Sequence, residues 1–181
     1  MTQPIINVNI TIAAPVEDPN TVRIPVTNKK GEIKYFLVDR EDFDRVNEYK
    51  WRIDARSYVR KGFGIFLHRF IMGIIEPKMV VDHVNGDKLD NRKANLRIVT
   101  NTQNAQNKKK QVNNTSGFKG VFFNKTTNKC VAQIRINGKC KYLGNFSTPE
   151  AAAHAYDEAA RIYHGEFGRY NFPREGERSA I

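Results

Sequence analysis

The sequence predicts an α+β protein in which a strand–strand–helix unit precedes a three-stranded antiparallel sheet packed on one helix. Three observations predict this class. Two apolar runs flank an Asn-Gly turn at residues 85–86, and a polar helical segment follows them. Two alternating runs flank a second Asn-Gly turn at 137–138. An alanine-rich helix then begins after a Ser-Thr-Pro sequence. The 181 residues, 40% of them hydrophobic, suffice for one domain or two small ones.

The N-terminal part of the chain predicts an arm and then a small mixed region. Residues 1–20 hold three prolines and predict an extended arm, and residues 21–78 predict an α+β region. The run 31–39 is expected to be a strand. Asp39 is then expected to cap a short helix that runs to residue 49. The segment 67–73 predicts another short helix that ends at its glycine. Core mass is expected from five aromatic residues: Trp51, Tyr58, Phe63, Phe66 and Phe70.

Residues 79–109 predict the strand–strand–helix unit itself. MVVDH is the first strand, LRIVT the second, and NTQNAQNKK the helix. Residues 110–116 are polar and predict a linker, which follows the basic run Lys108, Lys109 and Lys110.

Residues 117–173 predict three strands and a helix, and residues 174–181 a tail. Thr148 is placed as the helix N-cap and Pro149 as the first helical residue, and Gly165 ends the helix. Alanines at helical spacing predict close packing of this helix on the sheet: Ala152, Ala155 and Ala159.

The Asn137-Gly138 turn sets the register of the hairpin and therefore its two faces. It places Ile136 opposite Lys139, Arg135 opposite Cys140, and Gln133 opposite Tyr142. One face, expected to pack in the core, carries Cys130, Ala132, Ile134, Ile136 and Leu143. The other, expected to be free, carries Val131, Gln133, Arg135, Cys140 and Tyr142. An arginine, an amide and an aromatic ring on a free sheet face suit a DNA groove, with an ordinary solvent face as the alternative.

The charge distribution indicates a polyanionic partner. The net charge is +11, and no acidic residue lies between Asp90 and Glu150. A stretch of one sign repels itself unless a partner of opposite sign binds it, and nucleic acid is the first candidate. An anionic membrane is the weaker alternative, because no basic amphipathic helix is present. The stretch holds twelve basic residues: Arg92, Lys93, Arg97, Lys108, Lys109, Lys110, Lys119, Lys125, Lys129, Arg135, Lys139 and Lys141.

Other protein classes find little support in the sequence. Two cysteines, Cys130 and Cys140, are too few for a disulfide framework or a zinc ribbon. The N-terminus has neither a charged leader nor a long apolar core, and no run reaches membrane-spanning length. We therefore expect a soluble cytoplasmic protein without a membrane partner.

The pair Asp82–His83 suggests phosphodiester hydrolysis. A neutral imidazole can accept a proton from water near pH 7, and a hard cation held by oxygen ligands can neutralise charge on the phosphate and the leaving oxygen. No second histidine or cysteine lies nearby in the sequence, which disfavours zinc. Adjacent residues on a strand point to opposite faces, so the strand must end at this pair for both to serve one phosphate. For His68, a partly buried structural role is favoured over a role near DNA.

The segment DHVNGDKLDNRKANLR, followed by TNTQN, resembles the HNH nucleases with their ββα-metal motif. The resemblance implies that His83 is the general base and Asp82 a metal ligand. It implies that Asn95 pins the loop and so orients His83. Asn104 stands where the family's last histidine is usual and would be the second metal ligand. This departure favours Mg²⁺, with Mn²⁺ as a substitute. Residues 33–78 also resemble the region before this motif in phage nucleases.

Residues 116–173 resemble the plant Apetala/ethylene-response-factor (AP2/ERF) DNA-binding domain. SGFKGV, AQIRINGK and YLGNFSTPEAAAHAYDEAA carry the likeness. The resemblance implies that the sheet enters the major groove and that four residues contact DNA: Lys119, Gln133, Arg135 and Tyr142. Phe122 replaces a usual arginine and Cys130 a usual aromatic residue, so the plant target sequence does not carry over.

Together the resemblances imply a phage or mobile-element endonuclease of the homing type that acts on double-stranded DNA. Lys108, Lys109 and Lys110 are expected to contact phosphates. One alternative is a DNA-binding regulator whose nuclease unit is inactive. Another is an RNA-binding protein, which we disfavour because the sequence suggests no platform of solvent-facing aromatic residues. The sequence leaves the target site, nicking versus double-strand cleavage, and monomer versus homodimer open.

Overall fold

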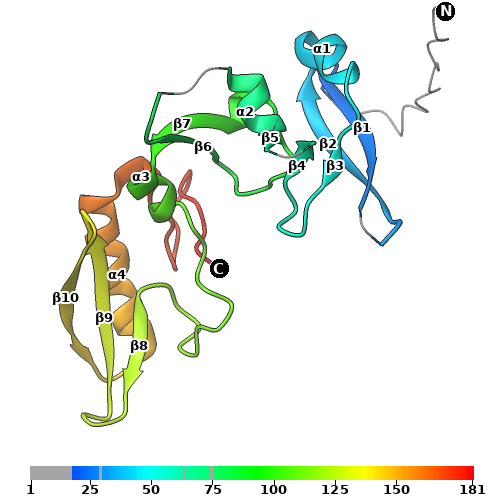
Figure 1. Ribbon diagram of the computed structural model, residues 1–181. Coiled ribbons are helices and arrows are strands. Elements are labelled where there is room, and N and C mark those ends of the chain that lie inside the picture. Colours follow the sequence, from blue (N-terminus) through cyan, green and yellow to red (C-terminus); the bar gives the residue numbers. More distant parts are fainter. Residues whose placement is uncertain (1–17, 29, 63, 74–75) are drawn as a thin grey trace, which may run out of the picture. The chain divides into compact units, whose positions relative to one another are not determined.

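The computed structural model describes residues 18–28, 30–62, 64–73 and 76–181 (Figure 1). Most of the predicted N-terminal arm, and Phe63, lie outside these residues. The chain divides into two compact units. The first consists of Met1–Pro77 and Val81–Ile98, and the second of Lys78–Val80 and Val99–Ile181. The division therefore falls within the predicted strand–strand–helix unit. Helices and small antiparallel sheets alternate along the chain, which confirms the α+β class.

The first unit is built from short strands and helices. β1 (Thr21–Thr27) pairs antiparallel with β2 (Ile33–Asp39), from Thr21 opposite Asp39 to Thr27 opposite Ile33. A second small sheet has the order β3-β4-β5. The remaining elements of the unit and its boundary are η1 (Arg40–Asp42), α1 (Phe43–Asn47), β3 (Arg52–Ile53), β4 (Val59–Lys61), β5 (Ile65–Phe66), α2 (Leu67–Met72), β6 (Met79–His83), η2 (Lys93–Asn95) and β7 (Leu96–Thr100). β6 and β7 pair as a two-stranded sheet.

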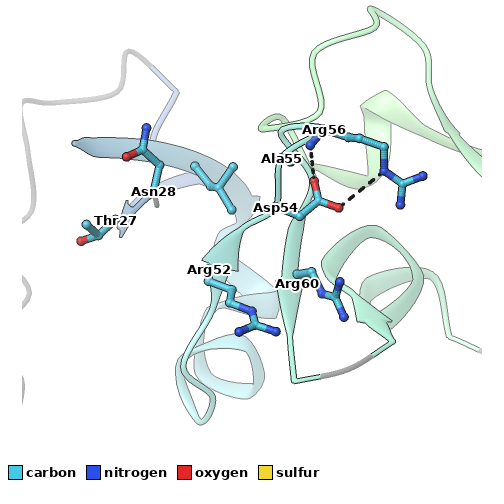
Figure 2. Close-up of a pocket in the computed structure, with 8 residues that line it drawn as sticks. Thr27, Asn28, Arg52, Asp54, Ala55, Arg56 and Arg60 are labelled. Carbon is cyan, nitrogen blue, oxygen red and sulfur yellow. Dashed lines mark hydrogen bonds and ion pairs between the residues drawn. The ribbon is translucent and has the colours of Figure 1, made fainter. Parts of the chain in front are cut away.

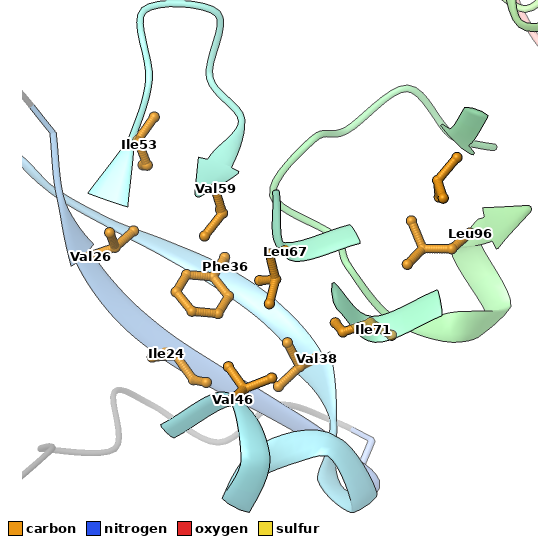
Figure 3. Close-up of a cluster of buried hydrophobic side chains, with 11 residues drawn as sticks. Ile24, Val26, Phe36, Val38, Val46, Ile53, Val59, Leu67, Ile71 and Leu96 are labelled. Carbon is orange, nitrogen blue, oxygen red and sulfur yellow. The ribbon is translucent and has the colours of Figure 1, made fainter. Parts of the chain in front are cut away.

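An apolar core holds the first unit together. Phe36 and Val38 alternate toward the interior of β2, as the period of a half-buried strand requires, and both are fully buried. Leu67 from α2 and Val46 from α1 close over them (Figure 3). Of the aromatic residues predicted to supply the core, Trp51 and Phe70 pack at its edge and are only partly buried.

Two of the helices predicted for this unit form, one with a correction. α2 occupies Leu67–Met72 and Gly73 follows with φ +77°, as the glycine predicted. The helix predicted after Asp39 is instead a 3₁₀ turn followed by the five-residue α1. The Asp39 side chain does not cap it, because its Oδ2 accepts a hydrogen bond from Lys93 N at 2.7 Å. The hydrogen bond from Lys93 thus takes the place of the local N-cap hydrogen bond that the sequence predicted.

The second unit contains a three-stranded antiparallel sheet of order β10-β9-β8 and one long helix (Figure 1). Its elements are α3 (Asn101–Gln106), β8 (Val121–Asn124), β9 (Lys129–Ile136), β10 (Lys139–Phe146), α4 (Pro149–Tyr163) and η3 (Gly165–Phe167). All three predicted hairpin pairs form. Asn137 and Gly138 both have positive φ, 48° and 80°, which is the turn that suits the twist of a two-residue hairpin.

The helix α4 covers one face of this sheet. Thr148 caps it by accepting from Ala151 N at 3.2 Å, and Pro149 is its first residue, as predicted. Its buried stripe meets Cys130, Ala132 and Ile134 of β9 and comprises Ala152, Ala153, Tyr156, Ala159 and Ala160. Of the three alanines predicted to pack on the sheet, Ala152 and Ala159 are buried, whereas Ala155 is only partly buried.

The expected free face of the sheet needs one correction. Gln133, Arg135 and Tyr142 are exposed as predicted, but Val131 is buried. Val131 lies opposite Asn145, beyond an irregularity of register between Tyr142 and Gly144. The exposed part of this face therefore includes Gln133, Arg135, Cys140 and Tyr142 but not Val131. No helix among the described residues combines the length and apolar character needed to cross a membrane.

Gly120 lies close to the Tyr156 side chain of α4. It has φ +76°, and a Cβ built there would lie 2.0 Å from the Tyr156 ring. We expect Gly120→Ala to lower the free energy of unfolding by about 1–3 kcal/mol beyond the backbone strain, because the overpacked ring must move. Urea unfolding of the matched control Gly138→Ala isolates the backbone part, about 1–2 kcal/mol. Gly138 has a similar φ, +80°, and no atom within 4 Å of such a Cβ. Equal losses in the two variants would show that the close approach is unimportant.

Candidate active site and nucleic-acid interface

The chain between β6 and β7 folds into a polar loop that is held by its own asparagines. β6 ends at His83, as the Asp82–His83 pair requires, and Gly86 N donates to His83 O at 2.9 Å. The Asn95 side chain spans the loop, accepting from Asn85 N at 2.9 Å and donating to Asp90 O at 2.8 Å. Asn95 therefore occupies a loop-pinning position, and its amide reaches His83 only through the loop backbone.

The same loop is attached to β2 by backbone pairing. Leu37 N donates to Leu89 O, and Asn91 N donates to Leu37 O, both at 2.8 Å. Asp90 between them is buried, and its carboxylate accepts two hydrogen bonds from Arg92 at 2.8 Å. Although burial works to raise the pKa of Asp90, the hydrogen bonds and charge of Arg92 lower it overall. The loop is thus fixed to the core sheet of the first unit.

Asn91 is the residue that contacts His83. Its Nδ2 donates to Lys88 O at 3.3 Å and Leu89 O at 3.2 Å, so its Oδ1 must face the imidazole. That oxygen lies 3.3 Å from His83 Nε2. An amide oxygen only accepts, which assigns the hydrogen of neutral His83 to Nε2 and the basic lone pair to Nδ1. The sequence argument did not single out Asn91.

His83 lies in a buried aromatic setting. Its ring centroid is 5.1 Å from that of His68 and 6.1 Å from that of Tyr58. Burial lowers the pKa of His83, opposed by the Asn91 hydrogen bond and the nearby carboxylates. Burial, with the charges of His83 and Arg69, lowers the pKa of His68 to about 3. Both rings are therefore neutral near pH 7, and the uncharged ring of His68 packs against the candidate base.

Asp82 is paired with Arg97 of β7. Both Arg97 Nε and a terminal nitrogen contact Asp82 Oδ2, at 3.1 and 3.0 Å, and the carboxylate is buried. Asp82 offers the hard oxygen that Mg²⁺ prefers. Among the residues that the structure describes, no group of three or more His, Cys, Asp or Glu side chains gathers as a metal site.

Asn104, the other predicted metal ligand, lies on α3 in the second unit and is partly buried. A complete capping box begins this helix: Thr100 Oγ1 accepts from Gln103 N, and Gln103 Oε1 accepts from Thr100 N at 2.8 Å. Side chains from the C-terminal block bind its other end. Lys119 Nζ donates to Gln106 O at 2.7 Å, and Arg169 Nε to Asn107 O at 2.6 Å.

The predicted DNA-contacting residues of the second unit occupy different settings. Gln133, Arg135 and Tyr142 share the sheet face opposite α4. Lys108 and Lys109 are exposed, whereas Lys110 is partly buried and its backbone N donates to Ala180 O. Lys119, which the resemblance assigned to DNA, is directed to the C-terminus of α3.

The sheet also exposes aromatic rings, contrary to the sequence argument. Tyr142 is 59% exposed, Phe123 49% and Phe122 40%. Phe122 pairs with Val131 in the register. The absence of solvent-facing aromatic residues was therefore a wrong premise, and it cannot be used against single-stranded or RNA ligands.

Comparison with known proteins matches the part of the chain that contains the β6–β7 loop. The family described as HNH endonuclease matches residues 67–106. An uncharacterized HNH endonuclease of Acanthamoeba polyphaga mimivirus is 32% identical over 149 residues, which are 78% of this chain and 77% of that protein. The chain belongs to the HNH endonuclease family. Protein 3.8 of Escherichia phage T7 is 30% identical over 98 residues, 54% of this chain and 80% of that protein.

The C-terminal block of this HNH endonuclease family member resembles a second group. Dehydration-responsive element-binding protein 2A of Oryza sativa subsp. indica is 45% identical over 62 residues, 33% of this chain and 22% of that protein. An ethylene-responsive transcription factor of Arabidopsis thaliana is 47% identical over 58 residues. The likeness to the plant proteins thus covers one part of each chain. No solved structure matches the chain.

The site of this HNH family member contains residues that sequence reasoning missed. Asn91 contacts His83 through its amide oxygen, and Arg97 pairs with Asp82. The sequence argument did consider His68, but it did not predict the contact between His68 and His83. The sequence argument gave a role to Asn95 and none to Asn91, whose amide lies next to His83 and whose backbone pairs with Leu37 of β2. For His68, its place inside an apolar helical segment was the available signal, and the favoured structural interpretation agrees with its burial.

Lys119 gives the second unit a measurable pH dependence. Burial and the charges of Arg169 and Arg178 lower the pKa of Lys119 from 10.5 to about 7. Between these values the unfolded chain binds a proton that the folded chain does not, so this lysine makes unfolding free energy rise as pH goes from 7 to 10.5. We expect urea unfolding at several pH values to show that rise in the wild type and in Lys125→Met, which removes an exposed lysine, but not in Lys119→Met. Parallel curves for all three would contradict the assignment.

Proposed function

We propose that this chain is a metal-dependent endonuclease that hydrolyses phosphodiester bonds in duplex DNA, with His83 as general base. The observation that carries the proposal is the Asn91–His83 hydrogen bond. It presents a neutral imidazole with its lone pair on Nδ1, immediately after a buried carboxylate on the same strand. An oriented neutral base beside an acidic residue suits activation of water for attack on phosphorus.

The chain's own groups divide the work of one hydrolytic step. His83 Nδ1 accepts a proton from water as the water oxygen bonds to phosphorus, and the bond from phosphorus to the leaving oxygen breaks. Asn91 holds the ring as it becomes charged, because its Oδ1 accepts from Nε2 in both protonation states. Asp82 and Asn104 are the proposed ligands of Mg²⁺, with Mn²⁺ as a substitute. When bound, the ion supplies positive charge to the phosphate and the leaving oxygen.

We further propose that the C-terminal sheet finds the site, in the manner of a homing-type endonuclease of phage or mobile-element origin. The exposed face with Gln133, Arg135 and Tyr142 supports direct reading of base edges. The exposed Lys108 and Lys109, with Lys110, are proposed to contact phosphates. In the proposed organisation, residues 79–109 are the nuclease motif, 110–116 the linker and 117–173 the AP2/ERF-like module.

A second candidate is a DNA-binding regulator whose nuclease unit is inactive. The Arg97–Asp82 ion pair is the observation that favours it, because the guanidinium contacts an oxygen that a metal ion would use. The exposed rings of Phe122 and Tyr142 are the observation that favours RNA or single-stranded DNA as the ligand, because bases can stack on them. Cleavage of duplex DNA by the purified chain separates both from the nuclease.

His83→Ala tests the catalytic proposal. We expect the wild type to cut duplex DNA with Mg²⁺ and to stop when EDTA is added. His83→Ala should lower the single-turnover rate at least about 100-fold, within the range of general-base contributions. Its duplex affinity should stay within about twofold, because the base contacts water rather than anchoring DNA.

Asn91→Ala serves as the intermediate case for His83. It removes the orienting acceptor and keeps the base, so its rate should lie between those of the wild type and His83→Ala. Undiminished cutting by His83→Ala, or full wild-type activity in EDTA, would overturn the proposed mechanism. Binding of duplex DNA by the wild type with no cutting under any divalent cation would favour the regulator.

Arg135→Ala tests sequence reading by the sheet. Arg135 lies on a rigid strand opposite Cys140, with a terminal nitrogen 3.8 Å from Cys140 Sγ. A guanidinium held in this way can bind guanine through two hydrogen bonds. We expect Arg135→Ala to weaken binding to the true site by about 1–3 kcal/mol and binding to scrambled duplex far less.

The control for Arg135 is Lys109→Ala, which removes an exposed cation of the basic run before the linker. It should weaken both duplexes alike, and competition binding at two salt concentrations measures both variants. If Arg135→Ala also weakens both duplexes equally, the sheet contacts phosphates and sequence is read elsewhere in the chain.

A further inference from the structure

A pocket of about 600 Å³ lies in the first unit, between the end of β1 and the β3–β4 hairpin (Figure 2). Thr27 and Asn28 line one side, and Arg52, Arg56 and Arg60 come from the hairpin. None of these residues was among the predicted DNA contacts. The pocket therefore lies outside both the HNH loop and the C-terminal sheet.

Arg52 and Arg60 face each other across the hairpin. They are partners in the β3–β4 register, and a terminal nitrogen of each donates to Gly62 O, at 3.0 and 2.9 Å. Figure 2 shows both side chains extending on the same side of the hairpin. Like charges directly opposite on neighbouring strands destabilise a sheet. An anion placed between two such guanidiniums removes this repulsion.

The local charge balance of the pocket leaves an excess of positive charge. Asp54 is the carboxylate in the lining, and the hairpin turn already uses it: Oδ1 accepts from Arg56 N at 2.8 Å and Tyr58 N at 2.9 Å. Its Oδ2 lies 3.8 Å from Arg56 Nε. Arg60 Nε is buried and has no hydrogen-bond partner within the described part of the chain. A buried charged donor without an acceptor is costly, and the negative charge of an anion bound to the same guanidinium would offset part of that cost.

The hairpin also leads directly to the candidate active site. Lys88 of the HNH loop donates from Nζ to Arg56 O at 2.8 Å, and it lies 4.5 Å from the centre of the Tyr58 ring. Tyr58, two residues before Arg60, faces His83 at 6.1 Å between ring centroids. An anion bound by the hairpin arginines would thus lie within the same unit as the general base, on the adjoining element.

We propose that this pocket binds phosphodiester groups of the duplex backbone that flank the phosphate attacked at His83. The proposal rests on the proposed endonuclease function and adds a positioning site to it. Guanidinium forks suit the geometry of phosphate oxygens. Six of the eight lining residues carry polar or charged side chains, and none is aromatic, in contrast to the aromatic lining typical of small-molecule pockets. Backbone contact, without base reading, is the role that this chemistry fits.

Salt-dependent binding tests the proposal without requiring cleavage. The full chain with His83→Ala is the background, and duplex affinity is measured over a series of salt concentrations without divalent ions. Arg60→Gln and Arg52→Gln should each reduce the slope of log affinity against log salt by about 0.9, and the double variant by about 1.8. The loss of affinity should be the same for target and scrambled duplexes, because phosphates carry no sequence.

Arg23→Gln is the matched control. Arg23 lies on β1 of the same unit with its guanidinium 4.3 Å from the centre of the Tyr35 ring, and it does not line the pocket. It loses the same charge and should keep the wild-type slope. If either strand variant unfolds in urea controls, Arg56→Gln in the exposed turn replaces it, with the same expected change of slope.

Two outcomes would overturn the proposal. One is a slope for the pocket variants equal to that of Arg23→Gln, whether both are unchanged or both are reduced. The other is a loss seen on single-stranded DNA of the same length and not on duplex. Failure of the wild type to cut DNA would instead contradict the nuclease proposal and leave the binding measurement intact. The two hypotheses can therefore fail separately.

Discussion

The candidate active site depends on one backbone pairing between distant parts of the first unit. Leu37 of β2 holds Leu89 and Asn91 through two hydrogen bonds of 2.8 Å. The residues on either side of Leu37 are Phe36 and Val38, which are fully buried in the core. Packing of the core thus fixes the position and direction of the polar loop relative to β2. Asn91, which is part of this loop, lies with its Oδ1 3.3 Å from His83 Nε2, so the same packing positions the group that contacts the imidazole.

The loop can hold so many buried polar groups because they satisfy each other. Asp90, Asn91 and Asn95 are all buried, and each has more than one hydrogen-bond partner. A buried amide or carboxylate left without a partner costs about 1–3 kcal/mol, whereas a satisfied one contributes about 1 kcal/mol. The network therefore strongly disfavours partial rearrangements. Rigidity of this kind is what a base must have if it is to meet a water molecule in one orientation.

Local chemistry explains what the sequence could predict. The strands 79–83 and 96–100, the hairpin register at Asn137-Gly138 and the Thr148 cap all follow from contacts within a few residues. Non-local contacts explain the misses. Asp39 does not cap its helix, because its side chain accepts a hydrogen bond from the backbone of Lys93, 54 residues away. Lys119 donates a hydrogen bond to the end of α3 and does not extend from the exposed face of the sheet. The sequence argument assigned the orientation of His83 to Asn95 and missed Asn91, because the pairing of Asn91 with Leu37 joins segments 54 residues apart.

Asp82 is buried, and its charge is offset by Arg97. A carboxylate buried without a partner is destabilising by several kcal/mol, and a proposed metal ligand has no metal until cofactor and DNA arrive. Arg97 compensates that charge within the folded unit, through two contacts to Oδ2. On the proposed function, an incoming phosphate brings negative charge that can also be shared with this guanidinium. On the same proposal, the pair offsets the charge of Asp82 before the metal ion and DNA bind, and Arg97 can contact the substrate afterwards.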